Sequence, residues 1–282
     1  MKLLNSKPFV DSQVEVLQNI IRDFELKPKL AIIVAKGYSE ASARYVKNKH
    51  KLAQRIGVEV ITHEIEWEGL EEETFETNLK TLIDQLNIDD TIHGIIVQLP
   101  VPYISDDLIS TLIVPHKDVD GFNPYNLGQL VRGNQLFTSC TPKGIMDFIS
   151  YNKIEVEGKN VCIVGRSNIV GKPLANLMTN AGATVIHCNS KTKDLKTMTN
   201  LADIVICAIG KPKFFGKDYF NKNSIVIDVG INFDENGKLC GDVDFEDVKG
   251  HVEAITPVPG GVGPLTVLSL MSNTIKSSFI LK

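Results

Sequence analysis

The sequence predicts an α/β protein of two domains, each built on a parallel sheet covered by helices. Strand-like apolar runs alternate with helix-length segments through most of the 282 residues, which is the pattern of parallel sheets. The alternation breaks at residues 114–144, where Gly, Pro, Asn and Asp are frequent. We place the first domain at residues 1–136 and the second at 137–264. Ligands bind such folds at the carboxyl ends of the strands, so we expect an active site in the cleft between the domains.

The first domain is expected to contain three strands and two long helices. Its strands are continuous apolar runs such as "KLAIIVA" and "GIIVQL", and the segments between them are long enough for helices. In chain order we expect a strand at 29–35, a helix at 39–56, a strand at 58–65, a helix at 71–87 and a strand at 94–99.

The second domain is expected to contain a five-stranded sheet. Its strands are short apolar runs such as "VCIV" and "SIVIDV". We expect the C-terminal helix, at about 265–282, to pack back on the first domain. The expected strands are 161–164, 184–188, 203–209, 224–229 and 251–256, with helices at 171–181 and 265–280.

Composition and cysteine spacing argue against several classes of protein. With a formal net charge of −4, the chain gives no reason to expect nucleic acid or an anionic membrane as partner. No apolar run approaches the roughly 18 residues of a membrane span, and the N-terminus has no apolar core of a secretory signal. The five cysteines form no C-x-x-C pair, so we expect neither a metal site nor a disulfide framework. Buried thiols in a reducing cytosol fit this pattern best.

The segment "VCIVGRSNIVGKP" reads as a strand, a glycine turn and a helix, which is typical of a Rossmann-like dinucleotide-binding domain. It lacks the G-x-G-x-x-G spacing, because Arg166 and Ser167 follow Gly165 and the next glycine is Gly171. NAD-binding domains usually carry an acid after the next strand to hold the ribose 2′-hydroxyl, but "HCNSKT" has none. Arg166 and Ser190 are therefore predicted to bind the 2′-phosphate of NADP. A sharp turn with an exposed arginine is the alternative.

The helix expected at 39–56 carries one lysine on its apolar face. At about 100° per residue, Lys49 shares a stripe with Tyr45 and two apolar residues, while the other basic residues project from the opposite side. Burial of an unpaired ammonium group lowers its pKa, and a lysine with a pKa near neutrality can act as an acid or base. Lys49 is therefore a candidate catalytic group. The alternative is that its ammonium group reaches solvent along its flexible stem.

Three polar residues and one late loop are further candidates. Gln98 follows "GIIV" at the carboxyl end of a strand, where α/β sites form. Asp118 and Asp120 are closely spaced in "PHKDVDGF", although a turn made by Asp and Gly explains that spacing more simply. The segment "ITPVPGGVGPLTV" is so rich in Pro and Gly that it predicts a loop of fixed shape, either a rigid surface loop or one that approaches a flat ligand.

These segments together resemble the bifunctional methylenetetrahydrofolate dehydrogenase/methenyltetrahydrofolate cyclohydrolase family. The matching pieces occur in the family's order, from about residue 30 to near the C-terminus. They are "ASARYVKNKHK", "HGIIVQLPVP", "HKDVDGFNPYNLGQL", "CTPKGIMDFI", "VGRSNIVGKP", "HCNSKT", "GDVDF" and "ITPVPGGVGPLTV". The resemblance implies NADP-dependent oxidation of 5,10-methylenetetrahydrofolate and hydrolysis of the methenyl product to 10-formyltetrahydrofolate. It also implies a cytoplasmic homodimer, paired through the nucleotide domain, with a role in one-carbon metabolism and purine biosynthesis.

The resemblance also implies roles for individual residues. Lys49 would be the catalytic lysine, Tyr45 would stack on or orient the folate, and Gln98 would hydrogen-bond the lysine. Asp120 would grip the pterin ring, with Asp118 beside it. Gly165, Arg166, Ser167, Ser190 and Ile231 would bind NADP, and Pro259, Gly260 and Gly261 of the 257–263 loop would line the nicotinamide and folate site.

Two features depart from the family pattern. The loop before Tyr45 often carries an acidic pair in this family, whereas this chain has Tyr38 and Ser39 there, and the first 28 residues match poorly. Both differences bear more on substrate affinity than on the chemistry. Two other functions are alternatives: a monofunctional NAD- or NADP-dependent dehydrogenase, and a catalytically silent NADP-binding protein. The presence of both Lys49 and Gln98 argues against the first, and the complete candidate set argues against the second.

Overall fold

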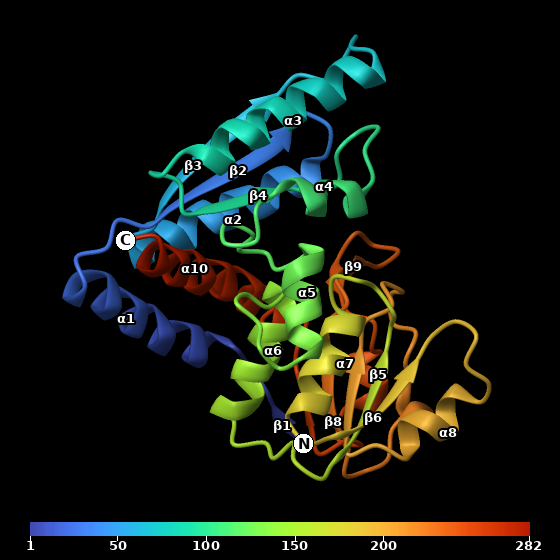
Figure 1. Ribbon diagram of the computed structural model, residues 1–282. Helices are drawn as coiled ribbons and strands as arrows, with labels where there is room; N and C mark the ends of the chain where they lie inside the picture. The colour runs from blue at the N-terminus through green and yellow to red at the C-terminus, as the bar shows by residue number, and fades with distance from the viewer. The chain divides into compact units, whose positions relative to one another are not determined.

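The computed structural model describes residues 1–282, except for the side chain of Ala41, and divides the chain into two compact units. Each unit is an α/β structure with its own parallel sheet, as expected (Figure 1). None of the described helices combines the length and the apolar character that crossing a membrane requires. Unit 1 comprises Met1–Asp11 and Thr141–Thr266, and unit 2 comprises Ser12–Cys140 and Val267–Lys282.

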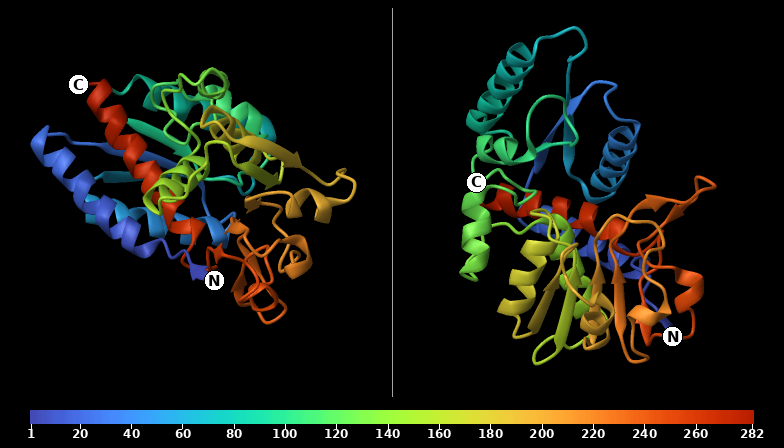
Figure 2. Two further views of the ribbon diagram at one scale, coloured as in Figure 1. Left: turned by 90° about the horizontal axis from the view of Figure 1, so that it is seen from below. Right: turned by 90° about the vertical axis from the view of Figure 1, so that its right-hand side faces the viewer.

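The sheet of unit 2 is built, in the described chain, from β2 (Lys29–Ala35), β3 (Glu59–Ile65) and β4 (Gly94–Val97). The strands are parallel and lie in the order β3-β2-β4. Helices α2 (Glu40–Ile56) and α3 (Glu72–Ile88) lie on opposite faces of this sheet (Figure 2). The five elements expected in this part of the sequence are thus confirmed.

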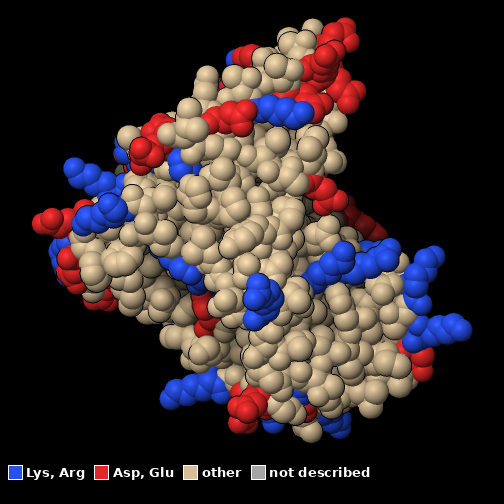
Figure 3. All heavy atoms as spheres, in the orientation of Figure 1, with Lys and Arg blue, Asp and Glu red and all other residues tan. Residues whose placement is uncertain are grey.

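One face of this sheet forms an apolar core with α3. Phe75, Leu79 and Ile83 of α3 are fully buried and pack with alternate sheet residues such as Ile33 and Ile95. Full burial of a side chain of this size contributes about 1.5–3 kcal/mol. The first turn of α3 is acidic, which suits the helix dipole, and acidic side chains gather on the surface over α3 (Figure 3).

Local signals set the ends of the helices in unit 2. The Ser39 hydroxyl accepts a hydrogen bond from the Ser42 amide at the start of α2, and Gly57 ends that helix in a left-handed conformation. The stretch that interrupts the βα alternation contains α5 (Pro124–Val131), which starts after the capping residue Asn123. The other helices that contribute to unit 2 are α1 (Lys7–Asp23), α4 (Asp106–Leu112) and α10 (Val262–Ile280).

The sheet of unit 1 has six parallel strands in the described chain, so the expectation of five was wrong. The additional strand is β1 (Lys2–Leu3), in which Lys2 pairs with Ala254. Two residues are too few to show a hydrophobic period, so no local signal marks β1. The other strands are β5 (Asn160–Val164), β6 (Thr184–Cys188), β7 (Ile204–Cys207), β8 (Ile225–Asp228) and β11 (Ala254–Ile255), in the sheet order β1-β11-β8-β7-β5-β6.

Helices and a small hairpin surround this sheet. The helix α7 (Gly171–Asn180) packs on β5 and β6 (Figure 1). A separate antiparallel hairpin is formed by β9 (Asn232–Phe233) and β10 (Leu239–Cys240). The remaining helical elements are α6 (Cys140–Tyr151), α8 (Leu195–Asn200), the 3₁₀ helix η1 (Lys217–Tyr219) and α9 (Phe245–Val248).

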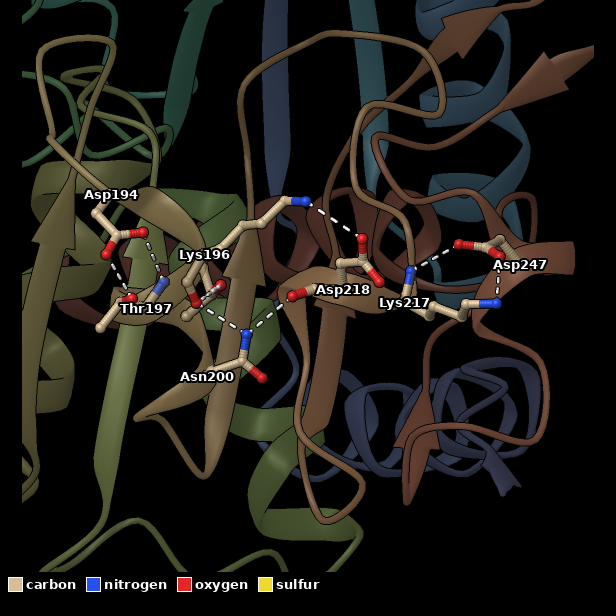
Figure 4. A network of polar contacts seen from close by, with 8 residues as sticks. Asp194, Lys196, Thr197, Asn200, Lys217, Asp218 and Asp247 are labelled. Atoms are coloured by element: carbon tan, nitrogen blue, oxygen red, sulfur yellow. Dashed lines mark hydrogen bonds and ion pairs between the residues drawn. The ribbon is translucent and has the colours of Figure 1, made fainter.

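Polar contacts join α8, η1 and α9 to one another (Figure 4). The Asn200 amide Nδ2 donates to the Asp218 carbonyl oxygen at 2.9 Å, and Lys196 Nζ lies 3.2 Å from the Asp218 carboxylate. The Asp247 carboxylate accepts a hydrogen bond of 2.7 Å from the Lys217 amide. These contacts join three short helical elements that lie in the connections between β6 and β7, β7 and β8, and β10 and β11.

Candidate active site

Helix α2 places Lys49 on the partly buried stripe that the sequence predicted. Leu52 and Ile56 of the same stripe are buried, whereas Lys51 and Arg55 are exposed. Lys49 itself is partly buried, and its Nζ donates a hydrogen bond of 2.7 Å to Oε1 of Gln98. The ammonium group therefore has a specific partner within unit 2.

Gln98 is held in place by the end of β4. Its backbone amide donates to the Ile33 carbonyl at 2.8 Å, and its Nε2 donates to the Leu99 carbonyl at 3.0 Å. The Leu99 carbonyl also accepts a hydrogen bond of 3.0 Å from the Ser42 hydroxyl of α2. The side-chain amide must consequently present Oε1 to Lys49, because its Nε2 is already engaged.

Burial shifts the pKa values of Lys49 and Asp120 in opposite directions. It lowers the pKa of Lys49, while the nearby Asp120 carboxylate and Cys140 thiol oppose that shift. It raises the pKa of Asp120, while Lys49 and a hydrogen bond with Cys140 oppose that shift. Burial therefore moves the two pKa values toward each other, which is the direction that acid–base chemistry near neutral pH requires.

The carboxylate of Asp118 is engaged within its own loop. It accepts hydrogen bonds from the backbone amides of Gly121, Phe122 and Asn123 and from Nδ2 of Asn126, at 2.8–3.2 Å. Gly121 has a φ of 74°, and a Cβ there would lie 2.6 Å from the Ser139 amide nitrogen. These contacts hold the loop in one conformation. They therefore fix the position of Asp120, which lies between Asp118 and Gly121.

Cys140 and Asn273 belong to this cluster, although the sequence did not single them out. Cys140 is buried, and its thiol donates to the Val119 carbonyl at 3.4 Å. Asn273 of α10 is also buried, and its Nδ2 donates to the carbonyls of Val119 at 2.8 Å and Thr138 at 3.1 Å. Both roles depend on tertiary contacts between segments far apart in the chain, so no local pattern could have indicated them.

Tyr45 lies on α2, one turn before Lys49, and the two atypical residues, Tyr38 and Ser39, precede this helix. The Tyr45 side chain is 38% exposed, which leaves its ring available to a ligand. Tyr38 packs edge-on against Trp67, with ring centroids 4.9 Å apart, and Ser39 caps the helix. A cavity of about 580 Å³ is lined by Ser39, the 34–37 segment, the face of α2 that carries Val46 and His50, and part of β3, but not by Tyr45 or Lys49.

The glycine turn of unit 1 fits a bound dinucleotide. A Cβ on Gly171 would lie 1.9 Å from the Gly165 carbonyl oxygen, and a Cβ on Gly165 would lie 2.1 Å from the Ala208 carbonyl oxygen. Both positions therefore require glycine. The Ser167 hydroxyl accepts hydrogen bonds from the amides of Val170 and Gly171 at 3.2 and 3.4 Å, at the start of α7. The turn thus closes tightly against the helix N-terminus, where anions bind.

Arg166 and Ser190 lie at neighbouring strand ends. Val164 of β5 pairs with Cys188 of β6, so each of the two residues lies two positions beyond a paired residue. Both side chains are exposed. Ile231, beyond the end of β8, is 45% exposed. Arg166, Ser190 and Ile231, three of the five predicted cofactor residues, therefore all follow the carboxyl ends of strands in one parallel sheet.

The Pro- and Gly-rich loop between β11 and α10 has the tight shape that its composition predicts. Gly260 has a φ of 100°, and its carbonyl accepts hydrogen bonds from both the amide and the hydroxyl of Ser6. A Cβ on Gly261 would lie 2.5 Å from the Pro257 carbonyl oxygen. Pro259 is exposed at the tip. The loop is therefore tight at Gly261, where a side chain would collide with the backbone, and exposed at Pro259.

These features define a class of protein: a Rossmann-type nucleotide-binding unit joined to an α/β unit with a partly buried lysine next to a carboxylate. Two family descriptions match the chain, "Tetrahydrofolate dehydrogenase/cyclohydrolase, catalytic domain" over residues 5–120 and "Tetrahydrofolate dehydrogenase/cyclohydrolase, NAD(P)-binding domain" over residues 139–280. The chain belongs to the tetrahydrofolate dehydrogenase/cyclohydrolase family.

Similar proteins span nearly the whole chain. The bifunctional protein FolD of Campylobacter concisus is 45% identical over 279 residues, which cover 98% of this chain and 96% of that protein. The crystal structure of the bifunctional enzyme FolD of Campylobacter jejuni is 42% identical, with a TM-score of 0.93 and 99% of each chain covered. The Trypanosoma brucei dehydrogenase-cyclohydrolase, solved in complex with NADP cofactor and inhibitor, is 31% identical with a TM-score of 0.89, covering 99% of this chain and 97% of that one.

Proposed function

We propose that this protein oxidises 5,10-methylenetetrahydrofolate with NADP and hydrolyses the methenyl product to 10-formyltetrahydrofolate. The observation that carries this proposal is the hydrogen bond between Lys49 and Gln98, with the Asp120 carboxylate close to the same amine. A dehydrogenase alone needs no such acid–base pair, because the cofactor itself accepts the hydride. The retained lysine cluster therefore supports the hydrolytic step as well as the oxidation.

The cofactor is proposed to bind at the carboxyl edge of the unit 1 sheet. Gly165 and Gly171 let the backbone approach a pyrophosphate, and the amides at the start of α7 face it. Arg166 and Ser190 are proposed to hold the 2′-phosphate, with Ser167 and Ile231 as further contacts. When bound, NADP supplies the hydride acceptor of the oxidation.

The folate is proposed to bind along α2 and the loop that carries Asp120. The exposed Tyr45 ring is a stacking surface, and the Asp120 carboxylate accepts hydrogen bonds from the pterin. Asp118, whose carboxylate is occupied by its own loop, would act by shaping that loop. Pro259, Gly260 and Gly261 are proposed to line the site, because Pro259 is exposed at the tip of their loop and the two glycines hold that tip in a tight conformation.

Hydrolysis requires a water molecule activated beside a cationic amidine carbon. The uncharged amine of Lys49 is proposed to hold this water and accept its proton. Gln98 Oε1 keeps the amine oriented, and the pKa of Asp120, raised by burial, suits a group that shares a proton with the lysine.

The hydrolytic rate should rise with pH as Lys49 loses its proton, below the ordinary lysine pKa of 10.5, because burial lowers that pKa. Asp120 opposes this shift, so Asp120→Asn should lower the pKa of Lys49 further and move the rising limb to lower pH. The measurement is the pH profile of kcat/KM for 5,10-methenyltetrahydrofolate, corrected for the uncatalysed rate. A limb that stays in place or moves to higher pH would exclude Lys49 as the titrating group.

One assay tests the proposed function directly. NADPH and methenyl-folate absorbance are followed together after 5,10-methylenetetrahydrofolate and NADP are added to the protein. We expect NADPH to form while the methenyl compound is produced and then consumed faster than in buffer. If the methenyl compound accumulates and is consumed no faster than in buffer, the protein is a monofunctional dehydrogenase. If no NADPH forms, it is a silent NADP-binding protein.

We also propose that the protein is a cytoplasmic homodimer that pairs through unit 1 and contributes 10-formyltetrahydrofolate to purine biosynthesis. All five cysteines are buried and none forms a disulfide among the described residues, which suits a reducing compartment. Phe233 on the β9–β10 hairpin is 56% exposed and offers an apolar contact for a second chain. The acidic surface over α3 and the net charge of −4 do not favour nucleic acid. A solution mass equal to one chain would contradict the dimer.

A further inference from the structure

The buried carboxylate of Asp242 binds both the loop that follows β7 and the segment that follows β8. Asp242 lies in the "GDVDF" segment after β10 and is fully buried. Its Oδ2 accepts from the amides of Ile209 and Gly210 at 2.6 and 3.1 Å. Its Oδ1 accepts from the Lys211 amide at 2.8 Å and from Asn232 Nδ2 at 2.9 Å. One side chain thus binds three successive amides of one loop and an amide side chain of another.

A second buried carboxylate fixes the backbone that carries Asp242. Asp228, at the end of β8, accepts hydrogen bonds from the amides of Gly230, Asp242 and Val243 at 2.9–3.0 Å. A Cβ on Gly241 would lie 1.8 Å from Asp228 Oδ2, so the chain can pass this carboxylate only at a glycine. The position of Asp242 is therefore set by the strand end itself.

The loops held by Asp242 adjoin the proposed cofactor residues. The 208–211 loop begins at Ala208, whose carbonyl would lie 2.1 Å from a Cβ on Gly165 of the phosphate turn. Asn232 directly follows Ile231, a proposed cofactor contact. Since β5, β7 and β8 are parallel neighbours, these loops share the edge at which dinucleotides bind.

We propose that Asp242 is a positioning residue for NADP, an inference that rests on the proposed cofactor site. Its carboxylate holds the loops beyond β7 and β8 in their binding shape before the cofactor arrives, so binding does not have to order them. Asp242 acts through these loops and does not touch the reacting atoms.

The test is the variant Asp242→Asn in the full chain, with NADP binding measured by titration calorimetry. The amide keeps the size of the side chain but places an NH₂ group among donors, so at least one charge-assisted hydrogen bond is lost. We expect the dissociation constant for NADP to rise at least about tenfold. Hydrolysis of 5,10-methenyltetrahydrofolate needs no NADP and should stay within about twofold of wild type, a separation that general destabilisation would not produce.

Asp247→Asn is the matched control. Asp247 also accepts a backbone hydrogen bond in unit 1, but from the Lys217 amide (Figure 4), which lies beyond the 209–211 amides that Asp242 binds. This variant should bind NADP as wild type does. An equal loss of NADP affinity in both variants would show a general effect of loop stability and overturn the proposal.

Asn232→Ala keeps the proposal testable if Asp242→Asn does not fold. It removes only the Asn232 contact, leaves the three amide contacts in place, and should raise the NADP dissociation constant about threefold or more. If Asp242→Asn folds and binds NADP with wild-type affinity, the proposal is overturned. If Asp242→Asn does not fold, wild-type NADP affinity in Asn232→Ala overturns it. If the wild type binds NADP but does not act on folate, the proposed function fails, and the calorimetry still decides the role of Asp242.

Discussion

Replacing Lys49 with methionine should abolish hydrolysis of 5,10-methenyltetrahydrofolate, with a rate loss of about 10²–10⁴-fold, the usual contribution of a general acid–base group. Methionine fills similar space but can neither exchange a proton nor donate to Gln98 Oε1, which lies 2.7 Å from the lysine nitrogen. The oxidation should persist in part, because its hydride acceptor is the cofactor, although a misplaced folate would slow it. The measurement is the initial rate of loss of methenyl-folate absorbance.

Lys51→Met is the matched control for this prediction. Lys51 is exposed on the same helix, so its loss should leave both activities within about twofold of wild type. Neither variant should unfold the protein, because Lys51 is exposed and, in Lys49→Met, the buried Asp120 can take up a proton once the lysine no longer opposes the rise of its pKa. Hydrolysis at the wild-type rate in Lys49→Met would show that Lys49 has no chemical role.

Replacing Arg166 with alanine should raise the KM for NADP about ten- to one-hundredfold and change the KM for NAD far less. The guanidinium group is exposed beyond β5, next to the strand end that carries Ser190. A charge-assisted contact with a 2′-phosphate contributes about 1.5–3 kcal/mol, and NAD has no such phosphate. The measurement is the initial rate of NADPH or NADH formation as each cofactor is varied.

Lys222→Ala is the control for Arg166→Ala. It removes one exposed positive charge from the same unit, but just before β8, at the amino end of that strand. This substitution should leave both the KM for NADP and the KM for NAD unchanged. Equal effects of Arg166→Ala on NADP and NAD would contradict the assignment of Arg166 to the 2′-phosphate.

The longer strands and the four helices that the sequence predicted have local signals, whereas helices such as α1 (Lys7–Asp23) and α6 (Cys140–Tyr151) were not predicted. The run "KLAIIVA" forms β2 at the expected residues, and the helical spacing around Lys49 places Leu52 and Ile56 inside, as expected. Strand β1 and the β9–β10 hairpin were not predicted, because two-residue strands carry no hydrophobic period. These residues are extended because they pair with another strand, which is distant in the chain for β1 and nearby for the β9–β10 hairpin.

The candidate site was predictable in its titratable residues but not in the residues that hold them. Lys49 stood out because a cation on an apolar stripe is unusual, and the structure pairs it with Gln98. Asn273 and Asp242 carry no such anomaly in the sequence: an amide in a C-terminal helix and an acid in a turn are both ordinary. Their partners lie far away along the chain, so only the folded structure shows what they hold.

The interleaving of the two units has a consequence for synthesis on the ribosome. Unit 2 combines Ser12–Cys140 with Val267–Lys282, so the whole of Thr141–Thr266 must be translated before its second segment. Until then Asn273 is missing, and the carbonyls of Val119 and Thr138 lack the amide that binds them together. Every proposed catalytic residue has by that time left the peptidyl transferase centre. A message truncated before α10 would thus encode all the chemistry but produce no finished lysine site, so a folding intermediate with only the cyclohydrolase activity is not expected during synthesis.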